Sequence, residues 1–171
     1  SLSANATLAI ASRKENIIST ATIFALFGFD WFQSHSTVQA IFDEVDIFLS
    51  EKKENTHKPR TLFPGAFDLL KSLKNEGVCI ALMTNDTQAG IEEFICGNKL
   101  EGIFDYLWSA EKQPSKPNPK AVIELCKRMN LNPSKCALIS DANTDLRMAK
   151  EADISIRIGF TGGWFKAPIL N

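Results

Sequence analysis

Apolar residues recur at helical spacing through the first fifty positions of the chain. Their period fits one face of each of two helices that meet near Gly28. The positions that define these faces are Ile17, Ile18, Ala21, Phe24, Ala25, Val38, Ile41, Phe42, Val45, Phe48 and Leu49. A charged stretch with almost no apolar residues follows at 51–60 and predicts a linker. We therefore expect a helical pair that is separate from the rest of the chain.

Short apolar runs alternate with helical segments from residue 61 onward. Strands are predicted at 78–83, 104–107, 136–139 and 154–158. Helices are predicted from Pro64 to Gly77, from the caps at 85–87 to Ile95, from Asn118 to Met129 and from Asn143 to Glu151. This alternation is typical of an α/β fold whose parallel sheet has helices on both faces. Such folds bind ligands at the carboxyl ends of their strands.

The composition is that of a globular protein. Among 171 residues, 44% are apolar and 23% are charged, and the formal net charge is −1. So small a charge gives no basic surface for a nucleic acid, and no apolar run approaches the roughly 18 residues of a membrane span. The four cysteines lack the CxxC spacing of zinc sites, which favours reduced thiols in a cytoplasmic protein.

Polar residues follow two of the predicted strands, and a lysine precedes a predicted helix between them. Thr84 and Asn85 follow the first strand, Asp141 and Asp145 follow the third, and Lys116 lies between. Each could be explained alone, as a helix cap or as solvated surface. Together they predict a phosphoryl-transfer site. Two carboxylates suit Mg²⁺, while a hydroxyl, backbone N–H groups and a lysine suit phosphate oxygens.

Three motifs in this order resemble those of the haloacid dehalogenase-like superfamily. The segments at 62–65 and 82–85 resemble its Pro-Gly helix and Ser/Thr motif, and 115–119 resembles its Lys-Pro-x-Pro motif. The segment at 139–149 resembles its acidic motif, with Ser140 in place of Gly. The chain is most similar to the helical-cap branch, subfamily IA, which includes phosphoglycolate phosphatases.

The resemblance implies an α/β class with a three-layer, Rossmann-like parallel core and a small helical cap. The cap is expected at 9–60, and the core at 61–171 with 1–8 added, incomplete at both ends. Residues 162–164 resemble a last active-site loop, after which the family continues with another strand and helix.

The resemblance also implies roles for the motif residues. Thr84 would hydrogen-bond the transferring phosphoryl group with Asn85 nearby, and Lys116 would bridge phosphate and nucleophile. Asp141 would bind Mg²⁺ directly, while Asp145 would support the metal site or orient Lys116. The implied substrate is a small phosphorylated metabolite, and a homodimer is left open.

The family's first motif, Asp-x-Asp-Gly-Thr, which carries the nucleophile, has no match here. In one interpretation Ser3, Asn5 and Thr7 are its remnant in a site without a nucleophile. In a second the chain is a fragment, and the true motif lies upstream of its internal start. In a third the segment from Phe24 to Asp30 is a strand that ends in the nucleophile.

A missing central strand has a physical consequence. The strands at 78–83 and 136–139 would each keep a row of unpaired backbone groups. Residues 6–11 or a neighbouring chain would then have to supply a substitute strand. Two functions therefore remain open. One is a Mg²⁺-dependent phosphatase acting through an aspartyl-phosphate. The other is a truncated or degenerate relative that binds phosphate or a protein partner without turnover.

Overall fold

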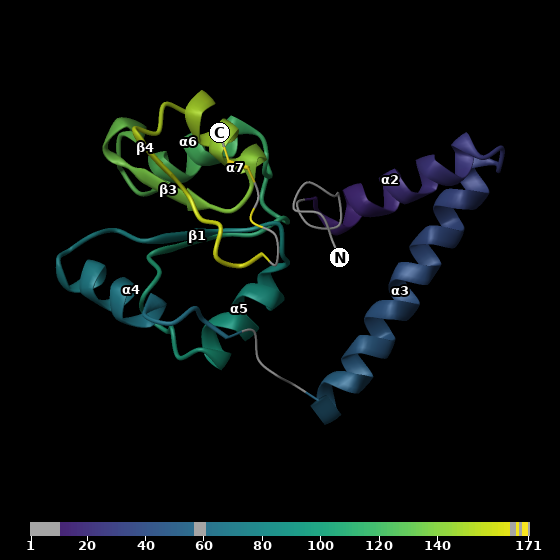
Figure 1. Ribbon diagram of the computed structural model, residues 1–171, viewed down its shortest axis with the longest axis horizontal. Coiled ribbons are helices and arrows are strands. Elements are labelled where there is room, and N and C mark those ends of the chain that lie inside the picture. The colour runs from purple at the N-terminus through teal and green to yellow at the C-terminus, as the bar shows by residue number, and fades with distance from the viewer. Residues whose placement is uncertain (1–10, 57–60, 165–166, 168, 171) are drawn as a thin grey trace.

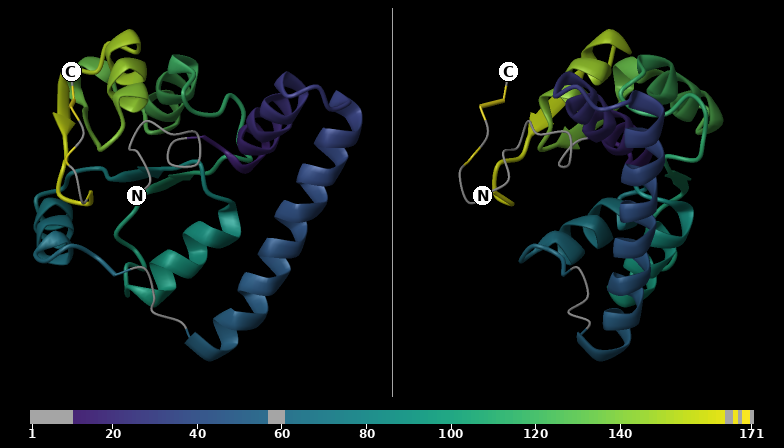
Figure 2. Two further views of the ribbon diagram at one scale, coloured as in Figure 1. Left: turned by 45° about the vertical axis from the view of Figure 1, so that its right-hand side comes forward. Right: turned by 90° about the vertical axis from the view of Figure 1, so that its right-hand side faces the viewer.

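The chain forms a long helix pair beside an α/β part, as the computed structural model shows for residues 11–56, 61–164, 167, 169 and 170 (Figure 1). In Figure 2 the helix pair stands along one side of the α/β part. Both parts follow from the change of hydrophobic period along the chain. Among the helices that the structure describes, none is long and apolar enough to cross a membrane.

The helix pair consists of α2 (Arg13–Leu26) and α3 (Trp31–Thr56). Ser12 caps α2, because its hydroxyl accepts from the backbone N–H of Glu15 and the Glu15 carboxylate accepts from the N–H of Ser12. Gly28 takes a left-handed conformation (φ 90°) in the turn between the helices. Asp30 then opens α3 by accepting from the N–H of Gln33 at 2.8 Å.

Two sequence expectations for this region are wrong. The interpretation of 24–30 as a strand fails because 24–26 belong to α2 and Asp30 caps α3. The predicted linker at 51–60 begins too early, since α3 continues to Thr56. Lysines and glutamates are good helix formers, so a charged stretch without Gly or Pro can continue a helix.

The α/β part contains two parallel half-sheets. The first comprises α4 (Ala66–Asn75), β1 (Ala81–Met83), α5 (Gln88–Gly97) and β2 (Tyr106–Trp108). The second comprises α6 (Pro119–Arg128), the 3₁₀ turn η1 (Pro133–Lys135), β3 (Ala137–Ser140), α7 (Asn143–Glu151) and β4 (Ile156–Gly159). β1 pairs with β2, and β3 pairs with β4. Helices α4 and α5 lie on one side of the strands and α6 and α7 on the other (Figures 1 and 2), so the predicted α/β class is confirmed.

Helix α6 joins the two half-sheets through their common core. Its Ala121 and Leu125 pack with Trp108 of β2, and its Val122 and Cys126 pack with α7. Met83 of β1 contacts both clusters. Leu138 of β3 and Cys136, which precedes β3, are partly buried and pack against the cluster that α6 forms with α7. The strands that carry the two polar motifs therefore rest on the same helix without being hydrogen-bonded to each other as one sheet.

Element boundaries differ from the sequence expectation by a few residues. β1 begins only at Ala81, and β2 extends to Trp108, which the sequence pattern left outside the strand. α4 begins at Ala66 rather than Pro64, because Gly65 stands before it in the left-handed region (φ 79°). The expected cap at Asn118 and the Pro at the first position of α6 are confirmed.

All four cysteines are free thiols. The sulfur atoms of Cys126 and Cys136 lie 3.9 Å apart. Burial, together with the neighbouring Cys136, raises the pKa of Cys126 to about 12. The Cys126 thiol is therefore protonated at neutral pH and packs as a small apolar group.

Candidate functional site

Thr84 stands where β1 ends. Its backbone N–H donates to Trp108 at 2.9 Å, which extends the pairing of β1 with β2 by one residue. The N–H of Asp86 donates to the Thr84 hydroxyl at 3.1 Å and fixes the side chain within the turn. The Thr84 hydroxyl can still donate its own proton to an oxygen of a ligand. Beside it, Asn85 is half-buried and its side-chain oxygen is enclosed.

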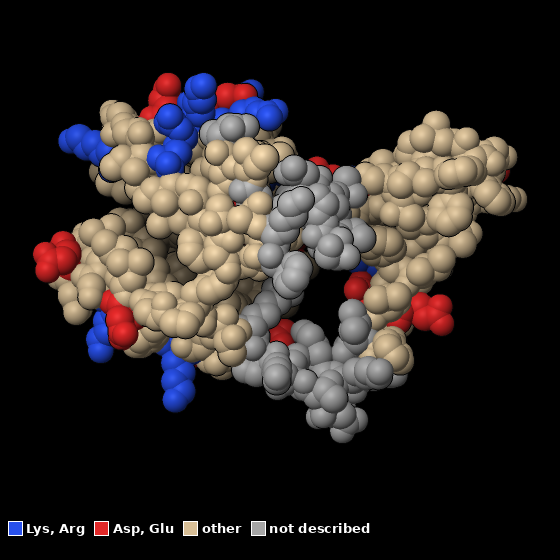
Figure 3. All heavy atoms as spheres, in the orientation of Figure 1, with Lys and Arg blue, Asp and Glu red and all other residues tan. Residues whose placement is uncertain are grey.

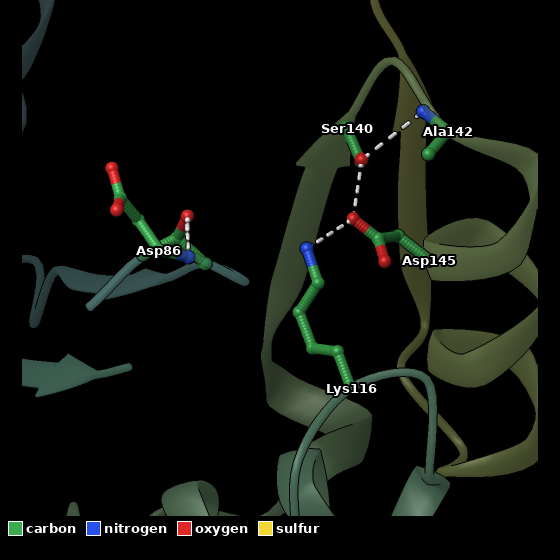
Figure 4. A network of polar contacts seen from close by, with 6 residues as sticks. Asp86, Lys116, Ser140, Ala142 and Asp145 are labelled. Atoms are coloured by element: carbon green, nitrogen blue, oxygen red, sulfur yellow. Dashed lines mark hydrogen bonds and ion pairs between the residues drawn. The ribbon is translucent and has the colours of Figure 1, made fainter. Parts of the chain in front are cut away.

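The second half-sheet carries a network of three polar side chains. Lys116 Nζ lies 2.6 Å from Asp145 Oδ2, and the Ser140 hydroxyl donates to the same oxygen at 2.8 Å. The N–H of Ala142 in turn donates to Ser140 at 3.2 Å. In Figure 4 the lysine reaches from the loop before α6, the serine from the end of β3 and the aspartate from α7. Side chains from two separate segments therefore converge on one carboxylate oxygen of a third segment.

Burial makes this network rigid. The side chains of Lys116 and Asp145 are only 13% and 11% exposed. A charge so poorly hydrated is stable only when it is paired and hydrogen-bonded. Asp145 also lies in the first turn of α7, where the helix dipole favours a carboxylate. The ammonium group of Lys116 is thus held at a fixed place near the carboxyl end of β3.

Asp141 faces a different partner. It is exposed just beyond β3 and accepts a hydrogen bond from the indole N–H of Trp164 at 2.8 Å. The two aspartates are therefore divided: Asp145 contacts Lys116, while Asp141 remains open to solvent on one side. Within the described part of the chain, no group of three His, Cys, Asp or Glu side chains gathers as a metal centre.

This donor set still fits Mg²⁺. The ion needs only one or two protein carboxylates, because it keeps several waters and takes further oxygens from a bound phosphate. Asp141 offers an exposed carboxylate at the strand end. Asp145 has one oxygen, Oδ2, engaged by Lys116 and Ser140. Asp141 is thus the stronger candidate for direct contact, and Asp145 is placed to orient the lysine.

The predicted site residues that the structure describes fall into two groups, and three further predicted residues lie outside the described part of the chain. Lys116 and Asp145 are in contact, and Asp141 lies four residues before Asp145 at the start of α7. Thr84 and Asn85 belong to the other half-sheet, and Figure 4 shows the neighbouring Asp86 on that side, apart from the network. Ser3, Asn5 and Thr7 lie outside the described residues.

Sequence reasoning missed two contributors. Ser140 appeared only as a replacement for glycine, yet its hydroxyl bridges Asp145 and the N–H of Ala142. Trp164 appeared only as part of a terminal loop, yet it donates to Asp141. A serine between an apolar strand and an acidic motif was a usable signal for the first, since such hydroxyls often cap the following turn. Nothing local indicated the second contact.

A cavity of about 540 Å³ lies elsewhere, along β2, and contains none of the predicted site residues. Lys112 and Arg128 line it and lie 5.8 Å and 5.2 Å from the ring of Trp108. Both cations already have partners there: Lys112 donates to the carbonyl of Leu107, and Arg128 pairs with Glu124. The strand ends, rather than this cavity, are therefore the candidate site.

Comparison with known proteins agrees with the motifs and the fold. The chain is 26% identical to a phosphoglycolate phosphatase of Pseudomonas putida over 110 residues, which cover 64% of this chain and 40% of that enzyme. The matched part of this chain therefore spans less than half of the length of that relative. A β-phosphoglucomutase structure from Clostridium difficile superposes with a TM-score of 0.63 at 20% identity, over 86% of this chain and 64% of that one.

A second solved structure is a family enzyme of Bacteroides thetaiotaomicron in complex with magnesium and inorganic phosphate. It superposes with a TM-score of 0.52 at 21% identity, over 61% of this chain and 56% of that one. The model of the haloacid dehalogenase-like hydrolases matches residues 4–158, which is most of the sequence. The chain therefore belongs to the haloacid dehalogenase-like hydrolase family.

Proposed function

We propose that this chain is part of a Mg²⁺-dependent phosphatase. The enzyme would act on small phosphorylated metabolites through an aspartyl-phosphate intermediate. The observation that carries the proposal is the buried contact of 2.6 Å between Lys116 and Asp145, beside the end of β3. A phosphoglycolate phosphatase among the relatives and a neighbour solved with magnesium and phosphate support the same chemistry.

Lys116 is suited to hold a phosphoryl oxygen. Its ammonium group has three N–H donors, and one of them donates a hydrogen bond to Asp145 Oδ2. The other two can donate to a phosphate without moving the side chain, because the contact with Asp145 already fixes the ammonium. A pre-positioned cation stabilises the charge that develops during phosphoryl transfer at no cost of reorganisation.

Thr84 would provide a neutral donor from the opposite half-sheet. Its hydroxyl is held by the N–H of Asp86 and keeps its proton for a ligand oxygen. Asp141 would hold Mg²⁺, with Asp145 in a supporting role. The ion, when bound, would neutralise charge on the phosphate oxygens. The indole of Trp164 orients the Asp141 carboxylate through a bond of 2.8 Å.

The chemistry requires one further carboxylate. Its oxygen would attack phosphorus as the phosphate ester bond breaks and the leaving oxygen takes a proton; water then hydrolyses the acyl phosphate. Asp145 is engaged by Lys116 and Ser140, and Asp141 is assigned to the metal. The nucleophile is therefore not among the site residues that the structure describes.

Two observations favour the second candidate, a relative that binds phosphate without turnover. The sequence has Ser3 and Asn5 where the family's first motif would carry aspartates. In addition, β1 and β3 belong to separate two-stranded sheets. In this alternative Thr84 and Lys116 still bind phosphate, but no covalent intermediate forms.

Phosphate release from p-nitrophenyl phosphate separates the two candidates. The phosphatase is expected to release phosphate with Mg²⁺ and to stop with EDTA, and Asp141→Asn or Lys116→Met should lower the rate about a hundredfold or more. Lys120→Met, which changes an exposed lysine four residues further on, is the matched control. A rate of phosphate release that is unchanged by EDTA and by Asp141→Asn would contradict the proposal.

A binding measurement covers the inactive case. If no phosphate is released, a titration of inorganic phosphate followed by ³¹P NMR should still show binding that Lys116→Met removes. That result supports the non-catalytic candidate. Activity gained when upstream codons of the gene are added would instead assign the nucleophile to the preceding segment.

A further inference from the structure

A cavity of about 320 Å³ lies between α7 and β4, on the surface of the second half-sheet. The described residues that line it are Asn143, Leu146, Arg147 and Lys150 of α7 and Arg157 of β4. Three of them are cations, which we name the cationic cluster, and none is a carboxylate. Figure 3 shows Lys and Arg side chains gathered over this end of the α/β part, although the net charge of the whole chain is −1. Positive charge is therefore concentrated around one cavity.

The cationic cluster lies on the opposite side of α7 from the candidate site. Arg147 and Lys150 are three residues apart and are therefore neighbours on one face of the helix. At about 100° per residue, both positions lie about 140–200° around the helix axis from Asp145. Asp145 is buried and contacts Lys116, whereas Arg147 and Lys150 are exposed. One helix thus carries the strand-end site on its inner side and the cationic cluster on its outer side.

Buried packing holds the two walls of the cavity together. Met148 and Ala149 of α7 and Ile154, which precedes β4, belong to the same buried cluster. The N–H of Ile154 donates to the carbonyl of Ala149 at 2.9 Å and closes the turn that leads into β4. The guanidinium of Arg157 donates to the carbonyl of Ile154 and is thereby tied to this turn. The cationic cluster is therefore assembled by the fold itself, before any ligand binds.

The cationic cluster has no acidic partner within the described part of the chain. None of the ion pairs there includes Arg147, Lys150 or Arg157. The adjacent Glu151 is exposed and does not line the cavity. The last turn of α7 favours a cation at Lys150 through the helix dipole, but this does not account for the other two. Because like charges on neighbouring positions repel, the arrangement becomes favourable when an anion lies between the cations.

The donors around the cavity match a phosphate group. A guanidinium presents its N–H groups in a planar fork that suits phosphate oxygens, and an ammonium adds a compact charge. Arg157 keeps further N–H donors after its bond to Ile154, because a guanidinium has five. A volume of about 320 Å³ is at the lower end of small-molecule sites. Three cations around so small a cavity suit a compact anion rather than the long backbone of a nucleic acid.

We propose that the cavity between α7 and β4 binds a small anion that carries phosphate groups, at a site separate from the strand ends. Arg147 and Arg157 hold phosphate oxygens from the two walls, and Lys150 supplies the third positive charge. A free inorganic anion and the phosphoryl group of a metabolite share this chemistry. The proposal uses none of the residues Thr84, Lys116, Asp141 or Asp145, and it therefore does not depend on the proposed phosphatase activity.

Titration of the full chain with inorganic pyrophosphate in EDTA, followed by ¹H–¹⁵N NMR, tests the proposal. We expect saturable shifts of the backbone amides around the cationic cluster, and Arg147→Gln/Lys150→Gln should raise the dissociation constant about tenfold or more. Lys116→Met should leave these shifts in place, because it changes only the strand-end site. The matched control is Lys120→Gln/Lys127→Gln, which removes two exposed lysines of α6 and therefore the same charge. This control should leave the dissociation constant unchanged.

Far-UV circular dichroism checks that the variants keep their fold. If Arg147→Gln/Lys150→Gln unfolds, Arg157→Gln on the other wall should weaken binding in its place. The proposal is overturned if the native chain shows no saturable shifts up to about 10 mM pyrophosphate, or if the shifts are abolished by Lys116→Met. Equal weakening in the α6 control also overturns it, because the binding would then follow net charge alone.

A parallel titration with glycerol phosphate separates the two sources of the anion. Tighter binding of pyrophosphate supports the proposal and assigns the cavity to a free inorganic anion. Tighter binding of glycerol phosphate supports it equally and assigns the cavity to a phosphorylated metabolite.

Discussion

The α/β part and the helix pair differ in how many of their side chains they bury. In the α/β part Trp108 and Met148 are each 1% exposed, and the polar strand ends satisfy one another through Lys116 and Asp145. In the helix pair Phe27 is 80% exposed, and the buried apolar cluster between the helices is small, with Ile17, Ala21 and Val38 as its members. The first region holds a site by its own packing. The second leaves large apolar side chains exposed at the turn between its helices.

The largest expected effect comes from the core that joins the two half-sheets. Met148→Ala removes a fully buried side chain of α7 and should lower the free energy of unfolding by about 2–4 kcal/mol. Urea unfolding followed by circular dichroism measures it. The matching variant in the other region is Val38→Ala, 2% exposed between α2 and α3, with an expected loss of about 1–2 kcal/mol.

The two variants also test whether the regions unfold together. Trp108 reports on the α/β part and Trp31 on the helix pair, so single-tryptophan versions can separate their transitions. We expect Met148→Ala to move mainly the Trp108 transition and Val38→Ala mainly the Trp31 transition. Equal shifts of both probes would show one cooperative unit and would remove the contrast between the regions.

The next effect concerns the buried ion pair. Asp145→Asn leaves the ammonium of Lys116 beside a neutral group at about one-eighth exposure and should lower the unfolding free energy by about 2–3 kcal/mol. Chemical denaturation of Asp145→Asn, Lys116→Met and the double variant gives the coupling energy. The reference is the exposed pair of Arg128 and Glu124, whose coupling should stay below about 1 kcal/mol. Equal coupling in both pairs would contradict a rigid site.

Sequence reasoning succeeded where the signal is local or periodic. The α/β class followed from alternating apolar runs and helices, and the cap at Asn118 with Pro119 located the start of α6. The resemblance to the family's motifs implied that Asp145 supports the metal site or orients Lys116, and the structure places these two side chains in contact. These features depend on a few neighbouring residues.

Other features depend on contacts that the sequence does not display. Trp164 meets Asp141 across 23 positions, and Ser140 became part of the site only through the turn that follows β3. Exposure on the helix pair was also unpredictable, since the same apolar spacing describes a buried face and an uncovered one. Helical period gives the direction of a side chain, but the presence of a neighbouring layer decides its burial.

A smaller effect is expected at the serine of the site. Ser140→Ala removes one of the two groups that contact Asp145 Oδ2 and leaves the N–H of Ala142 without its acceptor. The expected loss is about 1 kcal/mol in denaturant unfolding, because the salt bridge from Lys116 remains. Ser155→Ala, which removes a single hydroxyl bond to the Ser134 carbonyl, is the control for a serine outside the site. A larger loss for Ser155→Ala would place the stabilising polar contacts elsewhere.

The smallest effect lies at the opposite end of β1, where a second ion pair is more open than the one at the site. Lys74 contacts Asp105, whose other oxygen accepts from the N–H of Ile80 at 2.8 Å. The bond from Lys74, followed by that from Ile80, holds the pKa of Asp105 below its usual value. A depressed carboxyl pKa stabilises the fold above the pKa of the unfolded state, near 4, and this stabilisation is lost as the pH falls through the folded value.

Asp105→Asn should therefore flatten the fall of the melting temperature as the pH is lowered from about 5 toward 3, while changing little of that slope above about pH 6. Glu101→Gln, an exposed carboxylate four residues earlier, is the control and should leave the slope as it is in the native chain. Both side chains of the Lys74 pair are 31% exposed, so solvent screens the interaction and the change should be smaller than at Asp145. If Asp105→Asn steepened the acid limb instead, the ion pair would not hold the end of β1. Packing alone would then fix the start of β1. Ionic contacts would stabilise the α/β part only at the carboxyl ends of its strands.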